Sequence, residues 1–208
     1  MIPFITRYAN TLGLLNAIHL HCVNRGNPRP YAIAAWRPDV DLPVPGTALM
    51  DQLVDELEGP LRQFAAPAQD AARPGRARQV WQCTLRTHPD SVPLSDGAWA
   101  SAVSRVVAAA GIAPTGDEAG CRWIALRTGD HEVRIVAPMM RLDGRLPRLH
   151  NDASRAKAVC QLIELETTGS RRHTAALARN IPISVPAPHA PATAISRPVP
   201  GRLPAASR

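Results

Sequence analysis

The chain has 208 residues, enough for one domain with a packed core, and 45% of them are hydrophobic. Its formal net charge of +7 favours an acidic partner, nucleic acid first and an anionic membrane second. An excess of arginine, alanine and proline also follows from a GC-rich genome, so the charge alone decides little. No apolar run reaches the roughly 18 residues of a membrane span, and the N-terminus lacks the order of a signal peptide. We therefore expect a cytoplasmic protein without a membrane partner, whose four cysteines are small buried side chains.

Residues 1–66 predict an N-terminal segment with two helices. Residues 12–20 favour a short helix, and the apolar residues 31–36 follow a turn region with proline and glycine. Residues 50–64 carry apolar side chains at helical spacing, with acidic residues early in the run, which predicts an amphipathic helix. Pro60 should kink or shorten that helix.

After a flexible basic linker at 67–78, residues 79–168 predict the order strand, helix, strand, strand, helix. The strands are expected at 79–86, 121–127 and 132–137, and the helices at 96–110 and 152–168. This order predicts an α+β fold, in which an antiparallel sheet carries helices packed on one face. Residues 169–208 are expected to be a tail without regular structure, because proline, alanine and serine dominate its later part.

Short signals mark the ends of these elements. Ser95 is the predicted N-cap of the first helix of this region, and Gly111 follows its last turn. The pair Gly129-Asp130 predicts a tight hairpin turn between the second and third strands. Asn151 is expected to cap the last helix and Gly169 to end it.

Many short segments of the sequence resemble the relaxase/mobilisation nuclease family, whose members nick single-stranded DNA to start conjugative transfer. The similar segments lie at 1–3, 14–15, 34–36, 81–86, 94–99, 111–117, 121–127, 135–137 and 143–152. The last is the most specific, because its order of Gly, Arg, Pro, Leu, His, Asn and Asp seldom arises by chance. The resemblance implies a relaxase-like β-α-β-β-α core and a role in a mobile genetic element such as a plasmid.

In that family a His-hydrophobe-His pair on one strand and a third histidine on a neighbouring strand hold a divalent cation. A tyrosine near the N-terminus attacks the scissile phosphate. Here the resemblance puts Glu132 and Arg134 at the paired positions, Gln82 at the third and Ala17 at that of the tyrosine. We therefore expect no metal, no cofactor and no family-type nicking, with Arg134 paired to Glu132 on one strand face instead.

A loop before the last helix is the candidate DNA-binding surface. Arg141, Arg145 and Arg148 precede His150 and Asn151 there. Arginines at a helix N-terminus suit phosphate groups, but they equally fit a solvated loop, and capping alone explains Asn151. We expect single-stranded DNA as the partner, with mobilisation accessory proteins as further candidates. Three tryptophans are predicted to be core residues rather than platforms for nucleobases: Trp81, Trp99 and Trp123.

Two other hypotheses stay open. The chain is an active endonuclease if Tyr8 or Tyr31 acts as a displaced nucleophile with Mg²⁺ or Mn²⁺. It is a protein-interaction module if its Pro- and Arg-rich tail is a docking segment. Other metal candidates are weak: His131 is predicted at an exposed hairpin turn, and His19 and His21 would not share a helix face.

Overall fold

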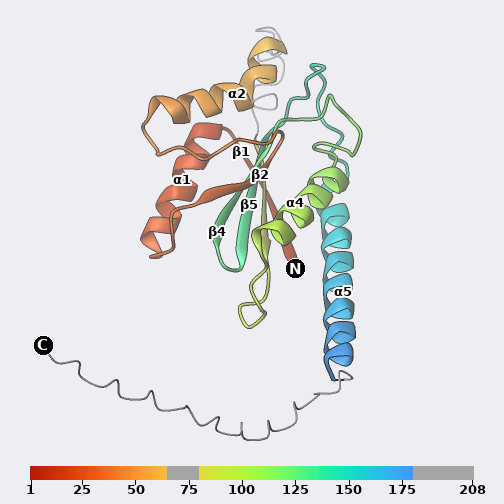
Figure 1. Ribbon diagram of the computed structural model, residues 1–208. Helices are drawn as coiled ribbons and strands as arrows, with labels where there is room; N and C mark the ends of the chain where they lie inside the picture. Colours follow the sequence, from red (N-terminus) through yellow and green to blue (C-terminus); the bar gives the residue numbers. More distant parts are fainter. Residues whose placement is uncertain (65–79, 180–208) are drawn as a thin grey trace, which may run out of the picture. The chain divides into compact units, whose positions relative to one another are not determined.

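The computed structural model describes residues 1–64 and 80–179, with residues 168–179 described by their backbone alone. Residues 1–171 form one compact unit and residues 172–208 a second. The described residues form five strands and four helices (Figure 1). The strands are β1 (Ile2–Tyr8), β2 (Tyr31–Ala35), β3 (Val80–Arg86), β4 (Ile124–Gly129) and β5 (Glu132–Pro138). The helices are α1 (Thr11–Asn24), α2 (Ala48–Phe64), α4 (Asp96–Ala110) and α5 (Asp152–Arg179). The predicted linker at 67–78 lies outside the described residues.

All five strands belong to one antiparallel sheet, in the order β1-β3-β5-β4-β2. At one edge β1 pairs with β3, so that Ile2 lies opposite Arg86, and at the other edge β2 pairs with β4. Both edge strands therefore come from the segment predicted at 1–66, and the central strands from the region predicted at 79–168. The chain is α+β, as predicted.

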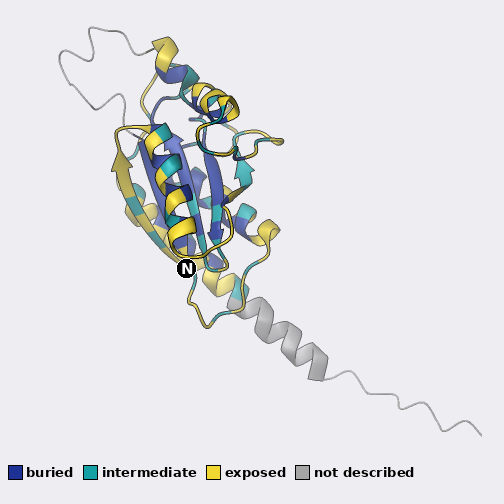
Figure 2. Cartoon of the chain, turned by 90° about the vertical axis from the view of Figure 1, so that its left-hand side faces the viewer, coloured by how far each residue is buried: buried dark blue, intermediate teal, exposed yellow. Residues whose placement is uncertain are grey.

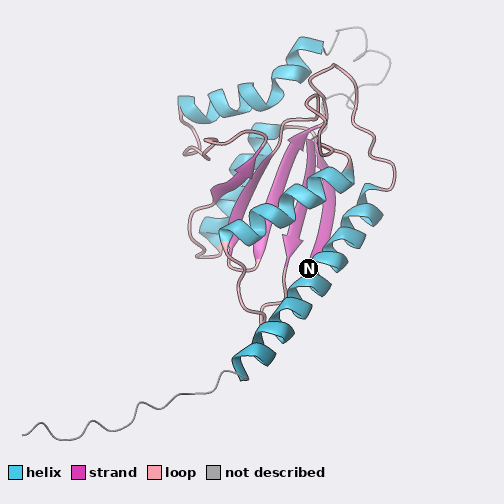
Figure 3. Cartoon of the chain, turned by 45° about the vertical axis from the view of Figure 1, so that its right-hand side comes forward, coloured by secondary structure: helices cyan, strands magenta, loops and turns pink. Residues whose placement is uncertain are grey.

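Helices cover both faces of the sheet, so the prediction of helices on one face is wrong. α4 and α5 pack on one face against strand residues such as Trp81 and Ile135, whereas α1 and α2 pack on the other against Val80 and Val136 (Figure 3). The central strands are consequently buried on both sides (Figure 2). The sequence of β3 does not indicate burial on both faces, because the polar residues Gln82 and Thr84 are typical of solvent-facing positions. In the structure both are buried.

The ends of α4 follow the prediction. Ser95 Oγ accepts a hydrogen bond from the backbone N–H of Ala98, and Gly111 follows the helix with φ 88°. α2 continues beyond Pro60 to Phe64, so the proline does not end this helix.

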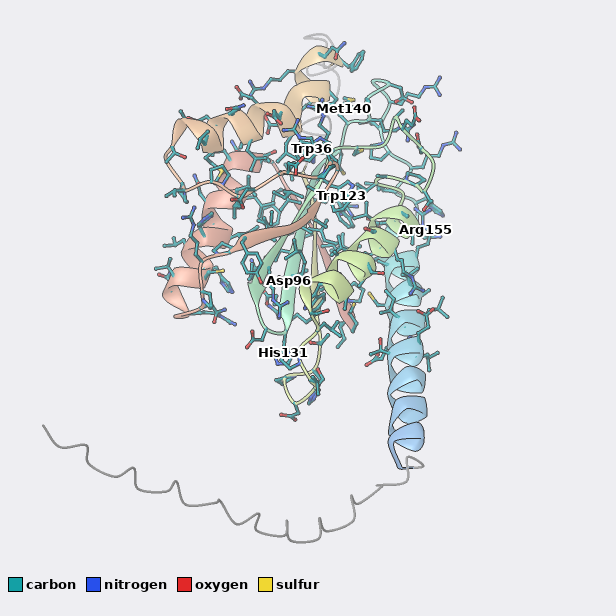
Figure 4. All side chains as sticks on the ribbon, in the orientation of Figure 1. Trp36, Asp96, Trp123, His131, Met140 and Arg155 are labelled. Atoms are coloured by element: carbon teal, nitrogen blue, oxygen red, sulfur yellow. The ribbon has the colours of Figure 1, made fainter. Side chains whose placement is uncertain are left out.

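The hairpin of β4 and β5 turns one residue later than predicted. Gly129 still pairs with Glu132, so Asp130 and His131 form the turn, and the register shifts just before Gly129. His131 lies at the hairpin turn, as predicted (Figure 4). It is half-buried rather than exposed, because its Nδ1 lies 3.0 Å from the hydroxyl of Thr87.

α5 differs from the prediction at both ends. It continues past Gly169 to Arg179, so the boundary predicted at 168 falls inside the helix. A single glycine costs a helix only about 1 kcal/mol relative to alanine, which does not by itself end a long helix. Asn151 has φ 56° and therefore lacks the extended backbone of an N-cap, whereas the carboxylate of Asp152 accepts a hydrogen bond from the N–H of Ala153 at 2.8 Å.

Candidate nucleic-acid interface

Alternate residues of β1, β3 and β5 form a continuous patch on the sheet face that carries α1 and α2. β3 pairs with β5 so that Arg86 lies opposite Glu132 and Thr84 opposite Arg134. Residues opposite one another in an antiparallel pair point to the same side of the sheet. We call this group of side chains, of which Gln82 and Thr84 are buried, the strand patch; its residues are Phe4, Thr6, Gln82, Thr84, Arg86, Glu132 and Arg134. It contains three of the four positions at which the resemblance places catalytic groups.

Glu132 is the centre of the strand patch. Its Oε1 accepts hydrogen bonds from Arg134 Nε at 2.8 Å and from Thr128 Oγ1 at 3.0 Å. Its Oε2 accepts one from Arg86 Nε at 2.7 Å. The predicted pairing of Arg134 with Glu132 is thus confirmed. Burial by itself raises the pKa of Glu132, but the contacts with Arg134, Thr128 and Arg86 outweigh it, so that the pKa is lowered and the carboxylate is ionised.

Both arginines contact Glu132 through Nε alone. Within residues 1–64 and 80–167, the η nitrogens of Arg86 and Arg134 have no hydrogen-bond partner. The η nitrogens of Arg134 are not among the enclosed polar atoms that lack a partner, and Arg86 is an exposed residue, so both groups reach solvent. The side chain of Arg86 is 46% exposed, and its guanidinium lies 5.8 Å from the ring centroid of Phe4. The patch therefore presents hydrogen-bond donors beside an exposed aromatic ring.

The strand patch does not fit the divalent cation that the resemblance implies. Both carboxylate oxygens of Glu132 are occupied by guanidinium groups, and two arginines beside them would repel a cation. Gln82 donates to Thr84 Oγ1 at 3.3 Å instead of facing an empty site. Across the described residues, no group of three or more His, Cys, Asp or Glu side chains is placed to hold a metal ion.

Ala17, the fourth substituted position, is exposed on α1 and has no nucleophilic group. His21 lies one helical turn later on the same side of α1. Burial lowers the pKa of His21, and the charges of Arg134 and Arg25 lower it further, which outweighs the opposite effect of Glu132. Arg134 thus lies close enough to α1 to act on the charge of His21, although burial is the larger cause of the shift.

The two tyrosines lie in opposite edge strands. Tyr8 lies opposite Val80 and so shares the sheet face of the strand patch, where it is exposed. Tyr31 donates its hydroxyl to Asp96 at the start of α4, which belongs to the other face (Figure 4). Burial and the hydrogen bond with Asp96 raise the pKa of Tyr31, whereas a nucleophilic phenol needs the reverse. Only Tyr8 remains near the strand patch as a candidate nucleophile.

The arginine loop predicted to contact DNA connects β5 to α5. Arg141 is already fully paired, because its Nη1 and Nη2 donate to Asp117 at 2.5 and 3.1 Å while Nε and Nη2 donate to Asp143 at 3.1 and 3.0 Å. The other predicted contact residues of this loop are exposed: Arg145, Arg148, His150 and Asn151. The loop and the strand patch are thus two separate groups of arginines with different hydrogen bonding.

Asp152 ties the arginine loop to the sheet. Its Oδ2 accepts a hydrogen bond from Trp81 Nε1 at 2.9 Å and pairs with Arg7 at 2.5 Å. Trp81 is fully buried, so this carboxylate satisfies an indole N–H that has no access to water. The other tryptophans predicted in the core, Trp99 and Trp123, are also buried, and so are all four cysteines.

Sequence reasoning missed Arg86 and Phe4 as members of the site. Arg86 lies four residues after Gln82, so strand alternation alone places both on one face. Its contact with Glu132 depends on the register between β3 and β5, which a single sequence does not reveal. Phe4 joins the patch only because β1 pairs with β3, a strand distant in sequence, so that Phe4 lies opposite Thr84.

The positive charge of the chain is unevenly distributed. Residues 1–64 and 80–167 contain 15 arginine and lysine residues against 16 aspartate and glutamate residues. Residues 65–79 and 168–208 contain nine against one, which accounts for the net charge of +7. A count by segment would have shown this from the sequence. The part of the chain that carries the strand patch has no overall basic excess, so any anion binding there depends on local geometry.

In comparisons with known proteins, the chain matches no family model, no curated protein and no solved structure. The family resemblance therefore rests on the short segments quoted above. None of the helices in the described part of the chain combines the length and apolar composition needed to cross a membrane.

Proposed function

We propose that this chain is a relaxase-like protein of a mobile genetic element that binds single-stranded DNA without cutting it. The observation that carries the proposal is the grouping of Gln82, Glu132 and Arg134 on one sheet face. Strands far apart in sequence bring these positions together, as a site for the scissile phosphate would require. The grouping supports a relaxase-like origin, and the residues themselves oppose the chemistry.

Two features of the strand patch favour a single strand over a duplex. Phe4 is 52% exposed on the edge strand β1, and a flat exposed ring suits stacking with an unpaired base. The guanidinium of Arg86 beside that ring supplies a donor to the backbone phosphate of the same nucleotide. In a duplex the bases are already stacked on one another and do not reach such a ring.

The lack of cutting follows from the groups present. Ala17 has no hydroxyl, and Glu132 is held by two guanidinium groups rather than by a metal ion. The alternative is an active endonuclease in which Tyr8 is the nucleophile, because this exposed phenol shares the sheet face of the strand patch.

The test is a fluorescence-anisotropy titration of a labelled single-stranded oligonucleotide at low and moderate salt, with Mn²⁺, followed by a denaturing gel. We expect affinity that falls steeply with salt and an intact oligonucleotide. Absent binding, or equal affinity at both salt concentrations, would refute the proposal. A cleaved strand attached to wild type and not to the Tyr8→Phe variant would establish the alternative.

The arginine loop is tested in the same titration with the double variant Arg145→Gln/Arg148→Gln. Both side chains are exposed, so the fold should tolerate the change. A loss of affinity in this variant would place the loop in the interface, as the sequence predicts. Unchanged affinity would confine the interface to the strand patch and the basic segments outside the described residues.

A further inference from the structure

We infer that Arg86 and Arg134 form a two-guanidinium fork that binds a phosphodiester group of single-stranded DNA directly, with no divalent cation. The inference rests on the proposed function and identifies the group that recognises the DNA backbone. Its basis is the disagreement between the strand patch and a metal site: the residues that exclude a cation suit an anion.

The first argument is the way in which Glu132 holds the two arginines. The carboxylate accepts one hydrogen bond from the Nε–H of Arg134, at 2.8 Å, and one from the Nε–H of Arg86, at 2.7 Å. These two hydrogen bonds fix the planes of both guanidinium groups. Each guanidinium keeps its two η nitrogens, which reach solvent and have no partner among the described residues. A guanidinium binds phosphate best through paired N–H donors in one plane, and fixing the plane beforehand lowers the entropy lost on binding.

The second argument is spacing. Arg86 lies opposite Glu132, and Arg134 lies opposite Thr84, so the two arginines are diagonal neighbours on adjacent strands. Diagonal neighbours on one sheet face are roughly 7–8 Å apart at the backbone, within reach for long side chains that converge on one ligand. A phosphodiester group, with its two non-bridging oxygens, is an anion of the size that two such arginine side chains can enclose.

The third argument is charge. Two guanidinium groups surround one carboxylate, which leaves the centre of the strand patch with one excess positive charge. The charge of Arg134 extends to α1, where it acts on His21 in addition to the burial that mainly lowers the pKa of that side chain. Because residues 1–64 and 80–167 have no basic excess as a whole, this local charge stands out against its surroundings.

Arg105 shows the contrast with an arginine whose η nitrogens are both paired. Arg105 on α4 donates both η nitrogens to Glu166, at 2.6 and 3.0 Å, and so has little left for a ligand. Arg105 is comparably exposed to Arg86 and lies on a helix of the opposite sheet face. It is therefore a matched control for the loss of one arginine charge from the folded part of the chain.

The experiment measures the affinity of a labelled oligothymidylate for the full chain in EDTA, for wild type and for Arg86→Gln, Arg134→Gln and Arg105→Gln. We expect wild type to bind in EDTA as well as in Mn²⁺. Arg86→Gln and Arg134→Gln should each weaken binding about tenfold, and the slope of log affinity against log salt should fall by about 0.7. Arg105→Gln should stay within about twofold of wild type, because a distant charge is screened over about 10 Å.

The double variant Arg86→Lys/Arg134→Lys separates geometry from charge. It keeps both positive charges but replaces each planar guanidinium with a single ammonium nitrogen, which cannot contact Glu132 and at the same time present two coplanar N–H groups to a phosphate. We expect it to lose affinity as the glutamine variants do, with a melting temperature near that of wild type. Full affinity in the lysine variant would overturn the fork, and so would a requirement for Mn²⁺.

The failures of the two proposals are distinguishable. Absent binding by wild type would refute the proposed function and the fork together. If wild type bound DNA and the affinities of Arg86→Gln and Arg134→Gln equalled that of Arg105→Gln, the fork alone would be refuted. Arg86→Gln guards against misfolding as a trivial cause, because its side chain is nearly half exposed whereas that of Arg134 is largely covered.

Discussion

The arginine loop and the strand patch contain the same kind of side chain in opposite states. In the loop, Arg141 donates through all three guanidinium nitrogens to Asp117 and Asp143. In the strand patch, Arg86 and Arg134 share one carboxylate and each uses a single nitrogen. Two acids around one arginine make a closed structural contact, whereas two arginines around one acid leave donors for a ligand. The ratio of acids to arginines within reach thus matters more than the number of arginines.

The two regions should therefore respond differently to mutation. Removing a side chain that forms the loop contacts should lower stability and leave DNA affinity unchanged. Removing an arginine of the strand patch should lower DNA affinity and leave stability nearly unchanged. The following changes test that separation, beginning with the largest expected effect.

The largest expected effect belongs to Asp152→Ala, at the junction between the arginine loop and the sheet. The substitution leaves the buried indole N–H of Trp81 without an acceptor and removes the partner of Arg7. An unsatisfied buried donor costs about 1–3 kcal/mol, so we expect unfolding free energy to fall by about 2 kcal/mol in urea denaturation. Oligonucleotide affinity of the folded protein should not change.

The same carboxylate predicts a pH dependence. Burial by itself raises the pKa of Asp152, but the hydrogen bonds from Arg7 and Trp81 outweigh it and the pKa is lowered. A lowered folded-state pKa gives stability that is present above the unfolded value of about 3.9 and is lost as pH falls through the folded-state value. Asp152→Asn keeps an acceptor for Trp81, so its unfolding free energy at neutral pH should lie below that of wild type by less than that of Asp152→Ala does. In strong acid the unfolding free energies of Asp152→Asn and wild type should be equal. A deficit that grows in acid would contradict this assignment.

Arg141→Gln is the second test, because it opens the closed contact of the loop. Hydrogen bonds from Arg141 lower the pKa of Asp117 and of Asp143, so the variant leaves two ionised carboxylates facing one another. We expect a lower melting temperature by circular dichroism at neutral pH, with a difference from wild type that shrinks below about pH 4. Affinity for the oligonucleotide should stay unchanged. A loss of affinity equal to that of Arg134→Gln would break the separation between the two regions.

The separation shows what the sequence could and could not predict. The three strands from residue 79 onward, the cap at Ser95, the buried tryptophans and the pairing of Glu132 with Arg134 all follow from local patterns, and the structure confirms them. The two edge strands β1 and β2 were not predicted as strands. The second layer of helices was missed because Gln82 and Thr84 resemble exposed strand positions. The state of each arginine was missed because it depends on which acids the register and loops bring near it, over separations such as 24 residues for Asp117 and 46 for Arg86.

Phe4→Ala sharpens the comparison within the strand patch. Stacking of a base on an aromatic side chain contributes about 1–3 kcal/mol, and one face of Phe4 is already near Arg86, so we expect the lower end, about a fivefold loss of affinity. The loss should be similar at low and moderate salt, because stacking displaces no counterions. The control Val92→Ala removes another exposed apolar side chain, outside the strand patch, and should not alter binding. A salt-dependent loss at Phe4 would mean that the ring acts by positioning Arg86.

The smallest expected effect concerns charges outside the described residues. Arg197, Arg202 and Arg208 account for three of the nine basic residues in those segments, with no acidic residue beside them. Replacing all three with glutamine should weaken binding at low salt and have little effect at moderate salt, because salt screens long-range attraction between charges. The ratio of affinities between wild type and Arg134→Gln should persist in this background, since the fork acts at short range. If that ratio disappeared, the strand patch would depend on the tail charges for its contact with DNA, and the distinction between local geometry and overall charge would fail.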